Sequence, residues 1–395
     1  MDRRPGTPSL LRELNDRAAL ELLLSGGPMT RAQLGEHTGL SKVTASQLLA
    51  RLEERGLVQV TGEQAGGRGP NAALYGVVPS AAYVAGLHVE RGEVSAGIAD
   101  VTGHVVAEVS VDPNGTGQPV ELVRGAVAAA CRSAGLATDA LRTLVIGTPG
   151  VLDPSTGEPR LAVNLPAWHD GVLDALRSDL GRPVRIENDV NLAAMAERAA
   201  DGAAAGADDF VLVWIGIGLG LAIVLGGRLY RGVGGAAGEI GYLPVPGVPL
   251  PQDVIHPATG AFQSLIGAQA LLPLAAGYGF AEATAGAAVR AAIGAAAAGD
   301  ERGGAFLAEL AGRVATGVAS ICVVLDPGLV VLGGEVGLGG GTALADRVAA
   351  EVGRISPTHP QVVPTSVTGD PVLRGAILAA VDRARSELLA SVASS

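Results

Sequence analysis

Residues 30–52 read TRAQLGEHTGLSKVTASQLLARL, and this stretch predicts two short helices joined by a tight turn. Thr30 and Ser41 carry hydroxyl groups of the kind that cap helix N-termini, so each predicted helix begins after one of them. Gly39 supplies the left-handed residue that the turn between the helices requires. Two helices joined in this way form a helix-turn-helix.

The second predicted helix has an apolar face and a polar face. Its apolar stripe, Ala45, Leu48, Leu49 and Leu52, recurs at helical spacing and predicts packing within the domain. The other side chains are of types that contact phosphates and base edges in the major groove of DNA. The predicted DNA-binding residues of this helix are Ser41, Lys42, Thr44, Ser46, Gln47 and Arg51.

Two short strands are predicted next, over residues 57–61 and 73–78, with a glycine-rich segment between them. Such a pair forms a wing, and Arg68 lies at its tip, where glycines let the backbone approach DNA. The other interpretation is that residues 10–78 form a small helical domain that packs on another surface. The turn, the caps, the polar face and the wing together favour binding of double-stranded DNA.

The charge of the chain is unevenly distributed. The net charge of −11 over 395 residues by itself argues against a nucleic-acid partner. Residues 1–79 contain nine basic and eight acidic side chains, however, so the acidity belongs to the rest of the chain. The N-terminal segment is therefore available to DNA phosphates.

Cysteine usage and hydropathy indicate a cytoplasmic protein. Cys131 and Cys322 lie inside apolar runs, which predicts buried thiols in a reducing compartment, with neither a disulfide framework nor a metal site. The basic N-terminus leads to no signal-type apolar run. The alanine-rich tract at 291–298 is interrupted by glycine and flanked by charge, so no membrane span is predicted.

The rest of the chain predicts an α/β body with two lobes of similar plan. Short apolar and polar alternations with glycines at the bends occupy residues 82–111 and recur at 209–231, each followed by mixed helix and strand patterns. With one domain per roughly 100–200 residues, this length predicts two or three domains. We expect domains at 1–79, 80–200 and 201–395, with the C-terminal helix packing back on the first lobe and ligand between the lobes.

Five motifs in the body occur in a recognisable order: GTPGVLD at 147–153, NLPAW at 164–168, ENDVN at 187–191, GGAAGEIG at 234–241 and LDPGLVVLGG at 325–334. With the winged helix in front, the whole chain resembles the regulator branch of the ROK family of repressors and sugar kinases. The resemblance implies an actin-like ATPase fold of the ribonuclease-H-like type, with a sugar in the interlobe cleft.

The resemblance also implies which side chains bind the sugar. Asn188 would hydrogen-bond its hydroxyls, Asp189 would accept from the hydroxyl that the kinases phosphorylate, and Glu239 would hold hydroxyls near the anomeric end. Amides and carboxylates suit a polyol because each forms several hydrogen bonds. The other interpretation is that Asp189 caps the helix at 190–199 and that Glu239 is an exposed turn residue.

The loop at 164–168 contributes a further candidate. Asn164 precedes a Leu-Pro-x-Trp segment that could close on the cleft, and it is the fourth predicted effector-binding residue. Trp168 is equally consistent with packing.

Substitutions in two predicted phosphate-binding loops argue against phosphoryl transfer. Family kinases place Asp-x-Gly-x-Thr at the first strand turn, where this chain has His88 in place of the Asp and Glu90 in place of the Gly. A carboxylate there repels ATP phosphates. The second phosphate loop, Gly-Thr-Gly in kinases, has Ile217 in place of the Thr. Because phosphoryl transfer depends on positioning and charge neutralisation, we predict no enzyme activity and no cofactor.

The structural zinc site of most relatives is also expected to be missing. Tyr242 occupies the position of the ligand His, and residues 243–263 contain no cysteine, so His256 alone cannot hold zinc. Gln263 matches the Glu that ends the motif. Since that His and Glu touch the sugar in relatives, Tyr242 and Gln263 are expected to line an altered effector site.

These observations predict a sugar-responsive transcription factor of carbohydrate metabolism, most simply a repressor. It would act as a homodimer or a higher homo-oligomer, and in a dimer ligand closure between the lobes would change the spacing of two winged helices. The alternatives are a sugar kinase with a DNA-binding appendage and a DNA-binding regulator without an effector. Glu90 and Ile217 distinguish a regulator from a kinase, and both favour the regulator.

Overall fold

The computed structural model describes residues 8–65, 71–90, 92–112, 118–161, 168 and 171–392. The chain divides into two compact units, each described by itself below. Unit 1 comprises Met1–Ile146, Asp174–Arg185 and Ala376–Ser395, and unit 2 comprises Gly147–Leu173 and Ile186–Gly375. This grouping differs from the expected domains at 1–79, 80–200 and 201–395, because Gly147–Leu173 and helix α6 (Asp189–Ala199) are counted with unit 2 and the N-terminal residues with unit 1.

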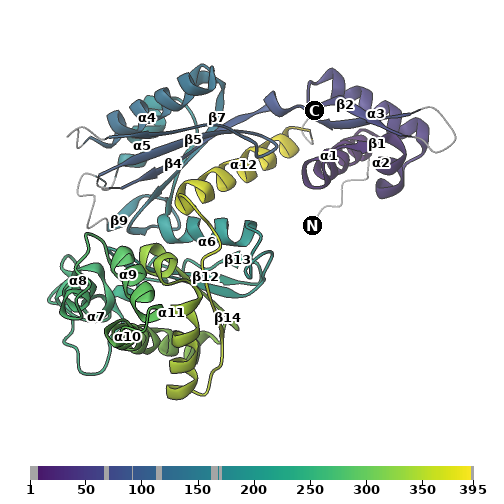
Figure 1. The fold of residues 1–395 in the computed structure, drawn as a ribbon. Helices are drawn as coiled ribbons and strands as arrows, with labels where there is room; N and C mark the ends of the chain where they lie inside the picture. The colour runs from purple at the N-terminus through teal and green to yellow at the C-terminus, as the bar shows by residue number, and fades with distance from the viewer. Residues whose placement is uncertain are drawn as a thin grey trace. The chain divides into compact units, whose positions relative to one another are not determined.

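The N-terminal part of unit 1 is a winged helix, as predicted (Figure 1). Its helices pack around buried leucines that include Leu20, Leu34 and Leu48. In its small sheet β3 lies between β1 and β2 and is antiparallel to both. The elements are α1 (Pro8–Gly26), β1 (Met29–Thr30), α2 (Arg31–Thr38), α3 (Lys42–Glu54), β2 (Val58–Gln64) and β3 (Ala72–Val77).

A five-stranded sheet forms the rest of unit 1, with the strand order β10-β7-β4-β5-β6. Helix α4 (Pro119–Ala134) packs on β5 and β6, and α12 (Pro371–Val392) packs on the opposite face (Figure 1). Ile377 of α12 lies against Gly86 and Gly97, where no side chain would fit. The strands are β4 (Tyr83–Val89), β5 (Val94–Asp100), β6 (Val105–Val111), β7 (Leu141–Thr148) and β10 (Val184–Asn188), and α5 (Val172–Leu180) is the remaining helix.

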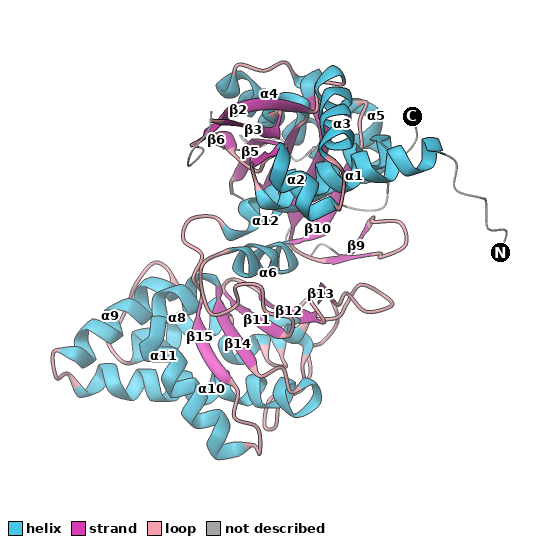
Figure 2. Cartoon of the chain, turned by 90° about the vertical axis from the view of Figure 1, so that its right-hand side faces the viewer, coloured by secondary structure: helices cyan, strands magenta, loops and turns pink. Residues whose placement is uncertain are grey.

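Unit 2 contains a second five-stranded sheet, with the order β13-β12-β11-β14-β15. Helices α9, α10 and α11 pack together beside this sheet and share its hydrophobic core (Figure 2). Helix α6 packs on β11 and β12. The elements are β11 (Phe210–Ile215), β12 (Leu219–Leu225), β13 (Arg228–Leu229), β14 (Leu329–Gly333), β15 (Gln361–Pro364), α9 (Ala285–Ala297), α10 (Glu301–Leu325) and α11 (Gly334–Ile355).

Shorter elements of unit 2 carry loops that matter for the site. They are β8 (Val151–Leu152), β9 (Pro159–Leu161), the 3-10 turns η3 (Ile240–Tyr242) and η4 (Pro257–Thr259), and helices α7 (Gln263–Ile266) and α8 (Ala268–Gly277). In unit 1, the 3-10 turns η1 (Pro79–Ala81) and η2 (Thr138–Ala140) precede β4 and β7.

The two large sheets share one plan. In each, the first strand in sequence lies in the middle, the second and third lie on one side, and the fourth and fifth lie on the other. In unit 2 the first two strands are antiparallel, whereas the fourth pairs with the first in parallel. This duplicated sheet order confirms the prediction of a two-lobed, actin-like α/β body.

Two details concern the apolar interior. Cys131 and Cys322 are buried, as expected for core residues, and burial raises the pKa of both thiols.

Helix α10 is long and apolar enough to cross a membrane by length and composition, which the sequence interpretation did not anticipate. More than half of its apolar window is buried within the protein, and a core helix meets the same criteria.

Candidate DNA-binding surface and effector site

The caps of the helix-turn-helix form as predicted. The Thr30 hydroxyl accepts a hydrogen bond from the Gln33 backbone N–H, and the Gln33 side chain accepts one from the Thr30 N–H, which makes a capping box. Gly39 adopts the left-handed conformation with φ of 71°. Ser41 caps α3 by accepting from Thr44 N–H at 3.2 Å. The turn between α2 and α3 is therefore fixed by local hydrogen bonds.

The buried face of α3 leaves a polar edge in solvent. Ala45, Leu48, Leu49 and Leu52 are buried, as predicted. Lys42 and Gln47 are exposed, and among the described residues their side chains form no hydrogen bond or ion pair. These two side chains are free to contact a ligand.

Three other predicted contact residues have partners inside the domain. The hydroxyls of Ser41 and Thr44 lie 2.8 Å apart and hydrogen-bond to each other. Ser46 donates to the Lys42 carbonyl at 3.0 Å and accepts from Arg31 Nη1 at 2.9 Å. Arg31, at the start of α2, was missed from the sequence, and its guanidinium is held beside α3 through this hydrogen bond.

Arg51 requires a correction to the predicted set. Its Nε and Nη2 donate to the carboxylate of Asp16 on α1, at 3.0 and 2.5 Å, and Asp16 is buried. The hydrogen bond with Asp16 raises the pKa of the Arg51 guanidinium. The side chain therefore joins α3 to α1 instead of extending toward a ligand.

The wing forms as an antiparallel pair of β2 and β3. The outer residues of β2, from Gln59 to Gln64, are exposed. Arg68, predicted at the tip, lies outside the described residues, as does Asn164 of the predicted effector site.

The second candidate site lies at the junction of β10 and α6, within unit 2. Asn188 is the N-cap of α6: its Oδ1 accepts from Asn191 N–H at 3.1 Å, and its Nδ2 donates to the Gly150 carbonyl at 3.1 Å. The expectation that Asp189 is the cap was wrong by one residue. Asn188 thus holds the 147–153 motif to the start of α6.

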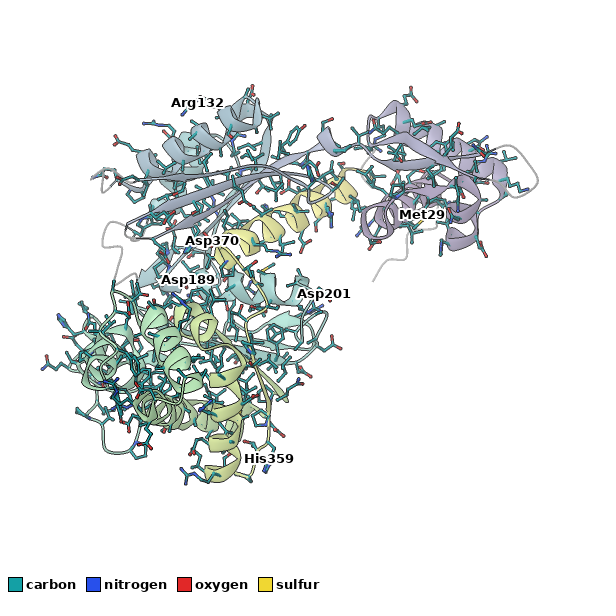
Figure 3. All side chains as sticks on the ribbon, viewed as in Figure 1. Met29, Arg132, Asp189, Asp201, His359 and Asp370 are labelled. Carbon is teal, nitrogen blue, oxygen red and sulfur yellow. The ribbon has the colours of Figure 1, made fainter. Side chains whose placement is uncertain are left out.

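Asp189 is the first residue of α6 (Figure 3). Its negative charge acts on the side chain of Glu239. The approach of the Glu239 loop depends on Gly238, which has φ of 102° and lies against the backbone of Leu221, where a side chain would clash. Burial, followed by the negative charge of Asp189, raises the pKa of Glu239 to about 7. The interpretation of Glu239 as an exposed turn residue was therefore wrong.

An ion pair beside these carboxylates was not anticipated. Arg231 donates from Nε and Nη2 to Oε2 of Glu187, at 2.9 and 2.6 Å. Glu187 Oε1 accepts from Asn188 N–H and from Asn191 Nδ2. The motif at 187–191 is thereby fixed on both sides of the Asn188 cap.

Tyr242 and Gln263 have structural partners. The Tyr242 hydroxyl donates to the Val254 carbonyl at 2.5 Å, and burial raises its pKa. Gln263 is only 7% exposed: its Oε1 accepts from Leu219 N–H at 3.0 Å, and its Nε2 donates to the Ile217 carbonyl at 2.9 Å. Both ends of the Gln263 amide are therefore hydrogen-bonded to the backbone at the Gly-Ile-Gly turn. This corrects the prediction that Gln263 lines the effector site, because its amide is already used within the fold.

The two altered loops are each well defined. Ile217 is 73% exposed at the tip of the turn between β11 and β12. At the end of β4, His88 Nε2 lies 3.4 Å from Glu90 Oε1, and the Glu90 side chain is largely exposed. The Ile217 turn thus presents a hydrocarbon side chain, and the end of β4 presents the carboxylate of Glu90, in the two loops where the sequence predicted loss of phosphate binding.

The remaining candidates have ordinary roles. Trp168 is buried, which favours packing. His256 pairs with Asp253 in the same loop, at 2.9 Å. Within the part of the chain that the structure describes, no three His, Cys, Asp or Glu side chains are grouped closely enough to hold a metal ion.

Comparisons with known proteins agree with both parts of the chain. The ROK family model matches residues 84–382, and the MarR family model matches residues 14–69. The DNA-binding transcriptional dual regulator NagC of Escherichia coli is 26% identical over 242 residues, which are 61% of this chain and 59% of that protein. The chain therefore aligns with about three fifths of the length of this curated relative.

Solved structures show the same fold. A ROK hexokinase from Thermus thermophilus is 29% identical, with a TM-score of 0.62 over 77% of this chain and 99% of that one. A ROK family transcriptional regulator, a homologue of the E. coli MLC protein, matches 97% of this chain and 99% of its own with a TM-score of 0.72 at 19% identity. That likeness includes the N-terminal winged helix from α1 to β3, which we call the head, and shows its fold.

Proposed function

The chain belongs to the ROK family, and we propose that it is a DNA-binding regulator of carbohydrate-metabolism genes, acting as a repressor. The observation that carries this proposal is the head: α2 and α3 are capped and buried on one side, while Lys42 and Gln47 stay unengaged on the other. Lysine and glutamine at that position can bind phosphates and base edges. Arg68, which the sequence predicts at the tip of the wing, would add a second contact.

We infer that the effector is a sugar or sugar derivative bound next to Asp189 and Glu239. Both carboxylates can accept several hydrogen bonds from hydroxyl groups. Arg231 is already neutralised by Glu187, so the nearby charge that remains is negative. This balance favours an uncharged or amino sugar over its phosphate ester, since a phosphate would face carboxylates.

The altered loops support a regulator without phosphoryl-transfer activity. Glu90 places a negative charge, and Ile217 a hydrocarbon, where a kinase needs positive charge or hydrogen-bond donors. Likeness to a hexokinase keeps sugar kinase as the second candidate. ATP turnover with any member of a sugar panel would favour that second candidate.

A homodimer would place two winged helices on one operator. Two-fold proteins read two half-sites about one helical turn, or a multiple of it, apart. A sugar can then change DNA affinity only by binding the DNA-competent and incompetent arrangements unequally. A regulator that binds DNA without any effector is the remaining alternative.

The test combines DNA binding with a sugar panel. Fluorescence anisotropy on the promoter region of the protein's own gene should give saturable binding that a Lys42→Ala, Gln47→Ala double variant weakens at constant salt. Thermal melting against sugars and their phosphate esters should then identify a stabilising ligand. Equal DNA binding by the wild type and the double variant, or ATP turnover with a sugar, would contradict the proposal.

A further inference from the structure

An apolar side chain is exposed at the start of α3. Val43, the second residue of α3, is 67% exposed, whereas the other large apolar side chains of α3 are buried. Valine is a weaker helix former than alanine, so the helix itself gains nothing from it. We propose that Val43 is a specificity-determining residue that packs against the 5-methyl group of a thymine in the operator.

The position of Val43 suits a base contact. The N-terminal residues of a recognition helix are those that reach base edges in the major groove. Gln47 lies one turn further along α3, on the same edge as Val43, because residues four apart are neighbours on a helix. Gln47 can form two hydrogen bonds with an adenine. The pair therefore fits an A·T-containing half-site.

The chemistry of the groove leaves one partner for Val43. The 5-methyl of thymine is the apolar group that base pairs present in the major groove. The hydroxyls of Thr44 and Ser46, which flank Val43 on the helix surface, are engaged inside the head. Contact with a methyl group would remove apolar surface of Val43 from water without leaving a polar group unpaired.

The charges near Val43 favour DNA over a protein partner. Lys42 precedes Val43, and Arg31 is held by Ser46, three residues along α3. Two cations beside an apolar side chain suit a polyanion that also offers methyl groups. This inference depends on the proposed DNA-binding function and adds which base the helix reads.

The test removes single methyl groups from DNA. A duplex is selected from a random-sequence library by the full chain, and each thymine of one half-site is replaced in turn by deoxyuridine. At one position the wild-type affinity should fall by about fourfold, the ratio expected from burial of one methyl group. Val43→Ala should bind the thymine duplex more weakly and lose the difference between thymine and deoxyuridine.

Two further variants make the result decisive. Val106→Ala removes an exposed valine from β6 and should keep the full methyl effect. Val43→Thr keeps the branched shape if the alanine variant melts early, and should show a reduced methyl effect. A methyl effect that persists in Val43→Ala, or is absent from wild type, would overturn the inference while DNA binding stands.

Two other outcomes are separable from these. If no duplex is selected, the proposed function fails and the inference fails with it. If Val43→Ala changes the oligomeric state in light scattering but leaves the methyl effect intact, Val43 contacts protein, and the thymine contact is refuted.

Discussion

Arg51 of α3 is ion-paired with Asp16 of α1, with Nη2 and Oδ1 2.5 Å apart. The sequence placed Arg51 on the polar face of α3, and the structure gives that charge a buried acceptor within the head. DNA binding and stability of the head are therefore assigned to different side chains of one helix.

Loss of this ion pair should destabilise the head. Because the Arg51 side chain is 34% exposed, we expect Arg51→Ala to cost about 1–2 kcal/mol, less than the roughly 3–5 kcal/mol for a fully buried pair. Urea unfolding of Arg51→Ala, Asp16→Ala and the double variant would measure the coupling. Normal stability of Arg51→Ala together with weakened DNA binding would return Arg51 to the DNA surface.

The DNA-binding surface predicts a graded loss of affinity. Alanine at Lys42, Gln47 or Arg68 should weaken operator binding by about 1–3 kcal/mol where a base contact is lost. Removing Lys42 and Arg68 should also make the slope of log affinity against log salt concentration shallower, by about 0.9 for each phosphate contact that is lost. Arg132→Ala, at an exposed position of α4 (Figure 3), is the matched control and should bind normally. Unchanged affinity of the triple variant at fixed salt would exclude this surface.

The effector site predicts a separation of sugar response from DNA binding. Asp189→Ala should keep operator binding without sugar and lose the sugar's effect, because Asp189 lies in unit 2 and not in the winged helix. Asp201→Ala, an exposed aspartate just beyond α6, should respond as wild type does. The assay is operator release during titration with the stabilising sugar. A full response by Asp189→Ala would mean that the effector binds elsewhere.

The raised pKa of Glu239 predicts how stability changes with pH. The unfolded side chain ionises near its ordinary value of 4.5, whereas the folded one holds its proton until about pH 7. Between these values the folded state binds more protons, so its stability falls as pH rises. Glu239→Gln should remove this contribution, and urea unfolding of both proteins from pH 5 to 8 measures it. Parallel pH profiles would show that Glu239 titrates normally.

The metal content provides a simple check. With Tyr242 in place of a ligand His and only His256 nearby, the purified chain should contain no stoichiometric zinc after dialysis. Elemental analysis gives the answer directly. One retained zinc per chain would contradict the expectation and indicate ligands from another segment.

Features set by neighbouring residues were predictable from the sequence. The capping residues Thr30 and Ser41 and the left-handed Gly39 act within a few residues of their own positions, and the buried stripe of α3 follows from helical spacing. The duplicated strand pattern likewise indicated two similar sheets, because each short strand shows its own alternation of apolar and polar residues.

Partners that are distant in sequence could not be predicted in this way. Asp16 lies 35 residues from Arg51, Gly150 lies 38 from Asn188, and Leu219 lies 44 from Gln263. A polar side chain is compatible with a ligand or with an internal acceptor until the fold places that acceptor. The sequence therefore overestimated how many polar residues stay available for ligands.

Lys42 is the only lysine among the 395 residues, and it is the first residue of α3. A lysine-specific endoprotease therefore has one target bond in this protein, between Lys42 and Val43. A bond inside a capped helix is cleaved only when the helix opens. The yield of the fragments 1–42 and 43–395 would thus report the opening of the winged helix alone, however stable the rest of the chain is.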